Sequence, residues 1–224
     1  HLAFVAARGQ ASFLQLPAWG KAKPEWRSES VGFFDGDTLT GVGLVLYRQL
    51  PKLPRYLAYL PEGPVLDWNR PDVDAHLEAL VAHARRNKAF AVRIGPTVVH
   101  HRWLAPTVKA AIADPEITAL SQATPDETTL VGTRVLRTLD HLGWQPQAEG
   151  HGFAAGQPKF NYQLRLTDAE GTPLNDEQLL KGMNQLWRRN IKKADKLGVT
   201  VTRGERADLA RFHHIYLETA ERDH

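Results

Sequence analysis

The pattern of apolar and polar positions predicts strands along the first half of the chain. Valine, leucine and aromatic residues are concentrated in residues 30–34 and 39–47, and the Asp35-Gly36-Asp37 segment between them is typical of a hairpin turn. Two further apolar runs predict strands, Tyr56–Leu60 after a proline-containing loop and Ala89–Ile94 before Gly95-Pro96. The same reasoning predicts two strands nearer the C-terminus, at residues 161–166 and 199–202.

Apolar residues that recur with the helical period predict helices between and after these strands. One begins after Pro71 and covers residues 72–88, with an apolar face formed by Val73, Leu77, Leu80, Val81 and Ala84. Another covers residues 175–198, because Asn175 suits an N-cap, Gln178 follows three residues later and Gly198 suits a helix end. Further helices are predicted at residues 1–8, 127–142 and 207–222, the last with Leu209, Phe212, Ile215, Tyr216 and Ala220 facing inward. Residues 97–126 give mixed signals.

These elements predict one α+β domain of mixed strands and helices, without internal repeats or a low-complexity linker. The hydrophobic content of 42% over 224 residues is enough for a substantial core. No apolar run approaches the roughly 20 residues that a membrane-spanning helix needs, and we expect a cytoplasmic protein. The chain starts inside a helical pattern without methionine, so we expect the natural N-terminus to lie upstream.

Composition excludes several kinds of chemistry. The sequence has no cysteine, which rules out disulfides and thiolate catalysis, and it has no Walker or dinucleotide glycine motif and no Gly-x-Ser-x-Gly elbow. The pairs His100-His101 and His213-His214 do not predict a metal site, because adjacent side chains point in different directions. A net charge of +3 does not by itself suggest a nucleic-acid partner.

Three local clusters of charge could bind anions. Lys21 and Lys23 lie between Trp19 and Trp26, where lysines could hold a phosphate group, although on spacing alone a packed aromatic loop with solvated lysines is the better interpretation. Arg222 lies among carboxylates near a helix end and could bind phosphate or form ordinary ion pairs. A basic helix could face polyphosphate, anionic lipid or RNA, or simply solvent, through Lys181, Arg188, Arg189, Lys192, Lys193 and Lys196.

Three stretches together resemble the Fem (FemABX) family of tRNA-dependent peptidoglycan aminoacyltransferases. They are Phe-Leu-Gln-Leu-Pro-Ala-Trp-Gly-Lys-Ala-Lys-Pro-Glu-Trp at 13–26, Trp-Arg-Arg-Asn-Ile-Lys-Lys-Ala-Asp-Lys-Leu-Gly-Val at 187–199, and Tyr-Leu-Glu-Thr-Ala-Glu-Arg-Asp at 216–223. Each occurs at the expected place in the order, so the resemblance spans nearly the whole chain. Pro-Glu-Gly-Pro-Val at 61–65 is similar to a further family segment.

The resemblance implies a cofactor-independent enzyme that moves an amino acid such as Gly, Ala or Ser from aminoacyl-tRNA to the stem-peptide amine of a peptidoglycan precursor. The acceptor would be UDP-MurNAc-pentapeptide or lipid II, and the enzyme would be a monomer at the inner face of the membrane. The family has two acyltransferase domains of the acetyltransferase (GNAT) type. Residues 1–224 would be the first, with a mixed, largely antiparallel sheet flanked by helices, and its final helix from about 207 would lead toward a second domain outside the chain.

The resemblance also implies roles for individual residues. Lys21 or Lys23, together with Arg222, would hold the diphosphate of the precursor. Gly95 stands where some relatives have an acidic residue, so no side-chain base is expected there. Positioning and charge neutralisation would then supply much of the rate. The implied tRNA or anionic-lipid surface consists of Arg188, Arg189, Lys192, Lys193 and Lys196.

Two other functions fit the same sequence. A CoA-dependent GNAT N-acyltransferase would have a similar fold, but the chain lacks the Arg/Gln-x-x-Gly-x-Gly/Ala pyrophosphate loop of such enzymes. A noncatalytic basic domain that binds RNA or membranes is the alternative outside enzymes.

Overall fold

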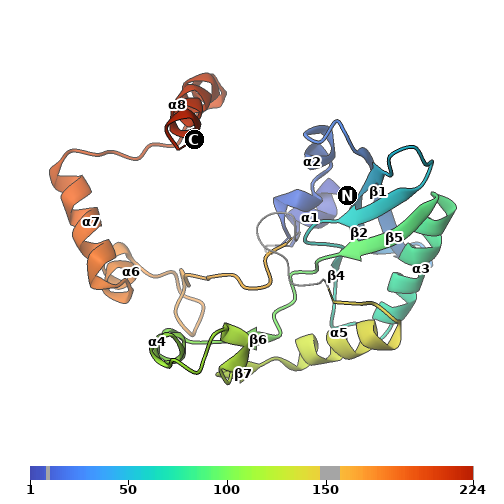
Figure 1. Ribbon diagram of the computed structural model, residues 1–224, viewed down its shortest axis with the longest axis horizontal. Helices are drawn as coiled ribbons and strands as arrows, with labels where there is room; N and C mark the ends of the chain where they lie inside the picture. The colour runs from blue at the N-terminus through green and yellow to red at the C-terminus, as the bar shows by residue number, and fades with distance from the viewer. Residues whose placement is uncertain (9–10, 147–156, 224) are drawn as a thin grey trace. The chain divides into compact units, whose positions relative to one another are not determined.

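The computed structural model describes residues 1–8, 11–146 and 157–223, which divide into two compact units, His1–Phe160 and Asn161–His224. The first unit is built on a β-sheet, and the second contains helices and connecting segments (Figure 1). The mixture of strands and helices confirms the predicted α+β fold class. Within the described ranges, no helix is long and apolar enough to cross a membrane.

The sheet of the first unit has five strands in the order β1-β2-β3-β5, with β4 paired to β2. Every pair of neighbours is antiparallel except β3 and β5, so the sheet is mixed and largely antiparallel, as expected. The predicted hairpin turn is present, and Gly36 has a positive φ of 56°, which favours glycine. The strands are β1 (Arg27–Asp35), β2 (Thr38–Gln49), β3 (Tyr56–Leu60), β4 (Val65–Leu66) and β5 (Ala89–Ile94).

The remaining elements of the first unit surround this sheet or follow it in the chain. They are α1 (Leu2–Ala6), the 3₁₀-helix η1 (Phe13–Gln15), α2 (Pro17–Lys21), α3 (Val73–Arg86), β6 (His101–Arg102), α4 (Ala105–Ala113), the 3₁₀-helix η2 (Leu120–Gln122), β7 (Glu127–Thr128) and α5 (Leu130–His141). The helix predicted at residues 127–142 therefore begins later. Residues 127–128 pair with β6, and the Thr129 hydroxyl caps α5 by accepting a hydrogen bond from the Gly132 N–H at 3.0 Å.

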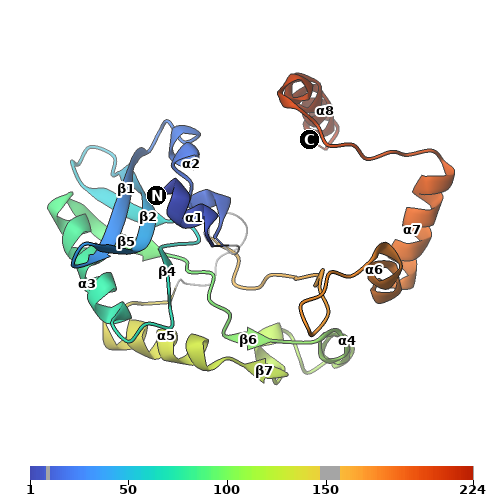
Figure 2. The ribbon, with the colours of Figure 1, turned by 180° about the vertical axis from the view of Figure 1, so that it is seen from behind.

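Alternate residues of β2 face two helical layers. Val45 and Tyr47 share a buried cluster with Leu80 of α3. Val42 belongs instead to a cluster that includes Val5 of α1. Figures 1 and 2 show α3 on one side of the sheet and α1 with α2 on the other. Because both faces of β2 are covered, residues 41–47 at its centre are glycine, aliphatic or aromatic and do not alternate with charged or amide side chains.

Gln15 joins the η1 segment to the sheet by occupying a gap in the strand ladder. On one side of β2, β4 pairs with residues 41–42 and β3 with residues 46–49, which leaves the intervening part of β2 without a strand partner there. The Leu44 N–H donates to Gln15 Oε1 at 2.9 Å, and Gln15 Nε2 donates to the Pro61 carbonyl at 2.6 Å. The side-chain amide thus replaces a backbone peptide of a neighbouring strand. Gln15 is 0% exposed.

The second unit contains α6 (Asp176–Gly182), α7 (Gln185–Lys196), the 3₁₀-helix η4 (Arg206–Asp208) and α8 (Leu209–Arg222). The predicted ends of the helix over 175–198 are correct, since Asn175 and Gln178 form a capping box and Gly198 has a φ of +70°. The prediction of one continuous helix over residues 175–198 was wrong, because the segment forms two helices, α6 and α7. Asn184 starts a new helix because its side chain accepts a hydrogen bond from the Trp187 N–H at 3.0 Å.

The strands predicted at residues 161–166 and 199–202 were also wrong. Among the described residues of the second unit, the only strand-like pairing is an isolated bridge between Thr167 and Pro173. An alternating sequence cannot form a sheet without a partner strand. The apolar face predicted to point inward on α8 is exposed in the described chain, with Phe212 66% exposed.

Candidate functional site

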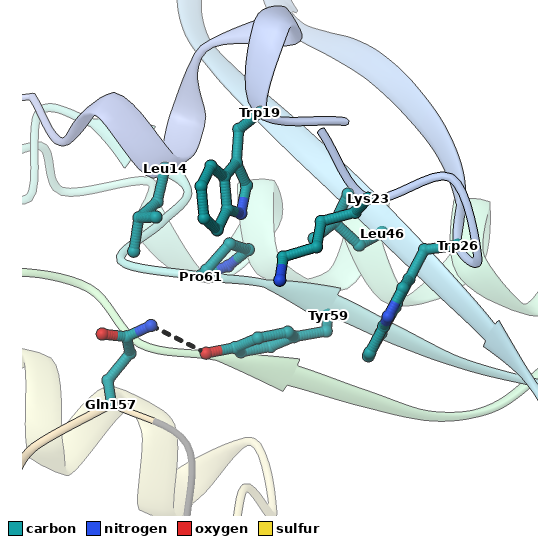
Figure 3. A pocket seen from close by; sticks show the side chains of 8 residues that line it. All are labelled: Leu14, Trp19, Lys23, Trp26, Leu46, Tyr59, Pro61 and Gln157. Carbon is teal, nitrogen blue, oxygen red and sulfur yellow. Dashed lines mark hydrogen bonds between the residues drawn. The ribbon is translucent and has the colours of Figure 1, made fainter. Parts of the chain in front are cut away.

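A pocket of ≈190 Å³ lies in the first unit, on the sheet face that carries η1 and α2. Aromatic rings, one amine and one amide face into it (Figure 3). Its size suits one group of a larger ligand rather than an entire drug-sized molecule. The lining residues are Leu14, Trp19, Lys23, Trp26, Leu46, Tyr59, Pro61 and Gln157.

Helix α2 forms one wall of the pocket because its sequence allows a close approach to the sheet. Pro17 occupies the first turn, where its missing N–H removes no helical hydrogen bond. A Cβ atom at Gly20 would lie 2.6 Å from Cβ and Oγ of Ser28 in β1, so only glycine fits without a shift. The Phe13 and Trp19 rings pack nearly at right angles, with 5.6 Å between centroids, and this contact helps to orient the indole.

Lys23 is the cation of the pocket. The Trp26 N–H donates to the Lys23 carbonyl at 3.0 Å across a turn that contains Pro24, and this turn presents Lys23 and Trp26 together. The Lys23 amine projects between Trp19 and Trp26, above Tyr59 (Figure 3). Its Nζ lies 5.0 Å from the Trp19 ring centroid, and no carboxylate of the described residues pairs with it. Its ammonium hydrogens therefore remain available to an anionic ligand.

The other predicted site residues lie elsewhere. Lys21 is the exposed last residue of α2 and does not line the pocket. Arg222 ends α8 in the second unit, where its Nε lies 3.1 Å from Asp223 Oδ1, so the ordinary ion pair that the sequence left open is present. The implied tRNA or lipid surface is confined to α7, and in the described chain each of its cations is exposed and forms no ion pair: Arg188, Arg189, Lys192, Lys193 and Lys196.

Sequence reasoning missed the floor of the pocket. Tyr59 and Leu46 are paired on β3 and β2, and their side chains line the pocket from below the α2 segment. The Tyr59 hydroxyl accepts a hydrogen bond from Gln157 Nε2 at 3.0 Å, and its ring lies 6.3 Å from that of Trp26. Strand alternation could have placed Tyr59 opposite the buried Ala58 and Leu60, but it could not have revealed Gln157 as a neighbour.

No carboxylate lines this pocket in the part of the chain that the structure describes. Gly95 comes immediately after β5. It is the residue that the resemblance aligned with an acidic side chain of some relatives. A Cβ atom there would lie 3.4 Å from Cγ of Gln157, so this position is next to the pocket wall. The described site can therefore hold an anion and stack a planar group, but its lining offers no side chain that could act as a carboxylate base.

One of the two histidine pairs, His100-His101, differs from the expectation that adjacent side chains point in different directions. The rings of His100 and His101 are 3.6 Å apart, and burial together with the charge of His101 lowers the pKa of His100. His214 instead pairs with Glu218 at 3.2 Å. Across the described ranges, no group of three or more His, Asp or Glu side chains is arranged to hold a metal ion.

Comparison with known proteins places the chain in a family. The FemAB family matches residues 1–224, the whole sequence. The chain belongs to the FemAB family. This confirms the resemblance seen in the segments around Trp19, Trp187 and Tyr216.

Individual FemAB relatives agree with this assignment. A lipid II:glycine glycyltransferase of Staphylococcus saprophyticus is 29% identical over 226 residues, which cover 100% of this chain and 46% of that protein. The protein of the same name from Staphylococcus aureus strain MRSA252 is 28% identical with the same coverage. The crystal structure of FemX has a TM-score of 0.67 and 26% identity, and covers 100% of this chain and 48% of that one. The chain thus spans about half the length of the relatives it matches.

Proposed function

We propose that this chain is the precursor-binding half of an aminoacyltransferase that builds peptidoglycan bridges. In this proposal, residues 1–224 form the first GNAT-like domain, and the helix from about 207 leads toward a second. The enzyme would transfer Gly, Ala or Ser from aminoacyl-tRNA to the stem-peptide amine of lipid II or UDP-MurNAc-pentapeptide. Family membership and relatives named lipid II:glycine glycyltransferase support this reaction class.

The single observation that carries the proposal is the position of Lys23. An ammonium group with no carboxylate partner among the described residues projects into a small pocket walled by Trp19, Trp26 and Tyr59. The aromatic walls exclude water, and this strengthens the attraction between the amine and a bound phosphate. Of the two lysines left open by sequence, Lys23 is therefore the one we assign to the precursor diphosphate. Arg222 would be the second cation of that clamp.

The reaction requires no protein nucleophile. The stem-peptide amine attacks the ester carbonyl of the aminoacyl-tRNA, an amide C–N bond forms and the ester C–O bond to ribose breaks. The amine proton ends on the released tRNA hydroxyl, so no cofactor is consumed. Because the ester is already activated, orientation of the two substrates can contribute much of the acceleration, on the order of 7–11 kcal/mol in favourable cases. A pocket that fixes the diphosphate provides such orientation.

Helix α7 is the proposed surface for the tRNA acceptor stem. Its five cations form no ion pair with the described residues, and Asp195 is the single acidic residue on the same helix. Cations that contact an RNA backbone displace the counterions bound to its phosphates, so tRNA affinity should fall as the salt concentration rises. The slope of log affinity against log salt concentration should be shallower in Lys192→Ala/Lys193→Ala, which makes fewer phosphate contacts. Filter binding at several salt concentrations measures this slope. An unchanged affinity and slope in the double variant would exclude these lysines from the tRNA surface. The enzyme would act as a cytoplasmic monomer at the inner membrane face.

Calorimetric titration with UDP-MurNAc-pentapeptide tests the diphosphate assignment. We expect Lys23→Ala to weaken binding by about tenfold or more, because a hydrogen bond to a charged group is lost. Lys21→Ala is the matched control, since it removes the same charge from an exposed position two residues away, and it should bind like the unmodified protein. Loss of binding in Lys21→Ala with normal binding in Lys23→Ala would refute the assignment. Saturable tRNA binding without any precursor binding would favour the noncatalytic RNA-binding alternative.

A further inference from the structure

Arg93 extends the pocket floor by one strand. Leu46 on β2 pairs with Tyr59 on β3, and Tyr59 pairs with Arg93 on β5, so the three residues form one cross-strand row. Residues paired in this way project from the same face of a sheet. The neighbours of Arg93, Val92 and Ile94, pack into the cluster on the α3 side. Arg93 therefore leaves the sheet on the face that carries the pocket.

Arg93 is a half-buried cation without a partner. Within the described ranges, every other half-buried lysine or arginine has a carboxylate or an aromatic ring beside it: Arg8 with Phe4, Lys23 with Trp19, Arg70 with Asp72, and Arg102 with Glu127. Arg93 has no ion pair, side-chain hydrogen bond or ring contact there. Withdrawing a guanidinium from water without a counter-ion is unfavourable, and a bound anion would offset that penalty.

In the described chain, the residues next to Arg93 along the strand and across the sheet supply no counter-ion for it. Gly95, two residues after Arg93 and just beyond the end of β5, contributes no side chain that could pair with it. The Gln157 side chain lies near Gly95, at the C-terminal end of β5, and its Nε2 donates a hydrogen bond to the Tyr59 hydroxyl. The pocket lining itself contains no carboxylate in the described chain. Within the described ranges, this row of residues therefore supplies no counter-ion for Arg93.

We infer that Arg93 binds a carboxylate of the acceptor's stem peptide, at a position separate from the diphosphate held by Lys23. The planar guanidinium donates two parallel hydrogen bonds that match a carboxylate, whereas a lysine ammonium acts on phosphate as a point charge. Every peptide ends in a carboxylate, so an acceptor that carries both a diphosphate and a peptide has an anion for each cation. This inference rests on the proposed function, and it adds a contact that reads the peptide portion of the substrate.

Titration of two ligands separates the inference from the proposed function. UDP carries the diphosphate but no stem peptide, whereas UDP-MurNAc-pentapeptide carries both. Arg93→Gln should weaken binding of UDP-MurNAc-pentapeptide about tenfold to a hundredfold, because the variant loses the charge-assisted hydrogen bonds to the peptide carboxylate. UDP has no peptide carboxylate, so its binding should be unchanged. Arg93→Lys should recover part of the loss. Arg55→Gln removes the same charge from an exposed loop and is the control.

Each result has one meaning. If the unmodified protein binds both ligands and Arg93→Gln matches Arg55→Gln for both, the inference is wrong and the proposed function stands. If Arg93→Gln weakens UDP and UDP-MurNAc-pentapeptide equally, Arg93 belongs to the diphosphate site, and the peptide contact is refuted. If the unmodified protein binds neither of these ligands nor lipid II, the proposed function fails, and the inference fails with it.

Discussion

Replacement of Gln15 with methionine should destabilise the first unit strongly although it changes the side-chain volume little. The variant leaves the Leu44 N–H and the Pro61 carbonyl without their partners in a fully buried position. Each buried unsatisfied group costs about 1–3 kcal/mol, so the free energy of unfolding should fall by about 2–6 kcal/mol. At about 2–4 °C per kcal/mol for a chain of this size, the melting temperature should drop by at least about 4 °C.

Gln15→Glu tests the same contacts one at a time. The carboxylate can still accept from the Leu44 N–H, but when ionised it cannot donate to the Pro61 carbonyl, which lies 2.6 Å from the present nitrogen. Burial and the facing carbonyl raise the pKa of such a carboxyl above its unfolded value of about 4.3. The stability deficit relative to the unmodified protein should therefore be small below about pH 4 and grow as the pH rises toward neutrality.

Urea denaturation followed by tryptophan fluorescence, at pH 4 and pH 7, measures both variants. Gln49→Met is the control, because Gln49 is exposed and its side chain makes a single hydrogen bond, to the Leu53 carbonyl. Surface substitutions of this kind usually change stability by less than about 0.5 kcal/mol. The reasoning is refuted if Gln15→Met is as stable as Gln49→Met, or if Gln15→Glu loses no stability between pH 4 and pH 7.

Two further substitutions test the α2 wall and the acid limit of the fold. Gly20→Ala places a Cβ 2.6 Å from Ser28 and should lower the free energy of unfolding by about 1–3 kcal/mol. Calorimetry should also show weaker precursor binding. Unchanged stability and binding would show that α2 has room to shift. Arg70 Nη2 lies 2.6 Å from Asp72 Oδ2, and this hydrogen bond lowers the pKa of Asp72 to about 2. The pair therefore stabilises the fold at pH values above the ordinary carboxyl pKa of about 3.9, and this contribution is lost as the pH falls toward 2. The stability difference between the unmodified protein and Asp72→Asn, measured by urea denaturation, should shrink over that interval, and a constant difference would contradict the pairing.

Local pattern was sufficient wherever an element's own residues determine it. Tyr56–Leu60 and Ala89–Ile94 were predicted to the residue, because each is a short apolar run that ends at a proline or glycine and is too short for a helix. The break in the helix after Gly182 was missed because a single side chain, Asn184, competes with the helical backbone there. The two incorrect strands had suitable alternation but no partner, and pairing is a property of the whole fold.

The site was less accessible to sequence reasoning because its members meet through tertiary contacts. Family resemblance selected the lysine-containing segment, yet the choice between Lys21 and Lys23 depends on the end of α2 and the turn after it. Gln15 stood within a recognised segment without a visible role, since its hydrogen bonds fill a gap between two strands that pair elsewhere with β2. Arg93 became notable only when its lack of a partner could be observed.

A transfer assay tests the central claim most directly. The full-length protein would be incubated with radiolabelled glycyl-, alanyl- or seryl-tRNA and with either lipid II or UDP-MurNAc-pentapeptide, alongside Lys23→Ala and Lys21→Ala. The account predicts that label from one of these tRNAs appears in the precursor, and that Lys23→Ala lowers the rate at low precursor concentration about tenfold or more while Lys21→Ala does not. Absence of label with every tRNA and both acceptors, from a folded protein, would contradict it.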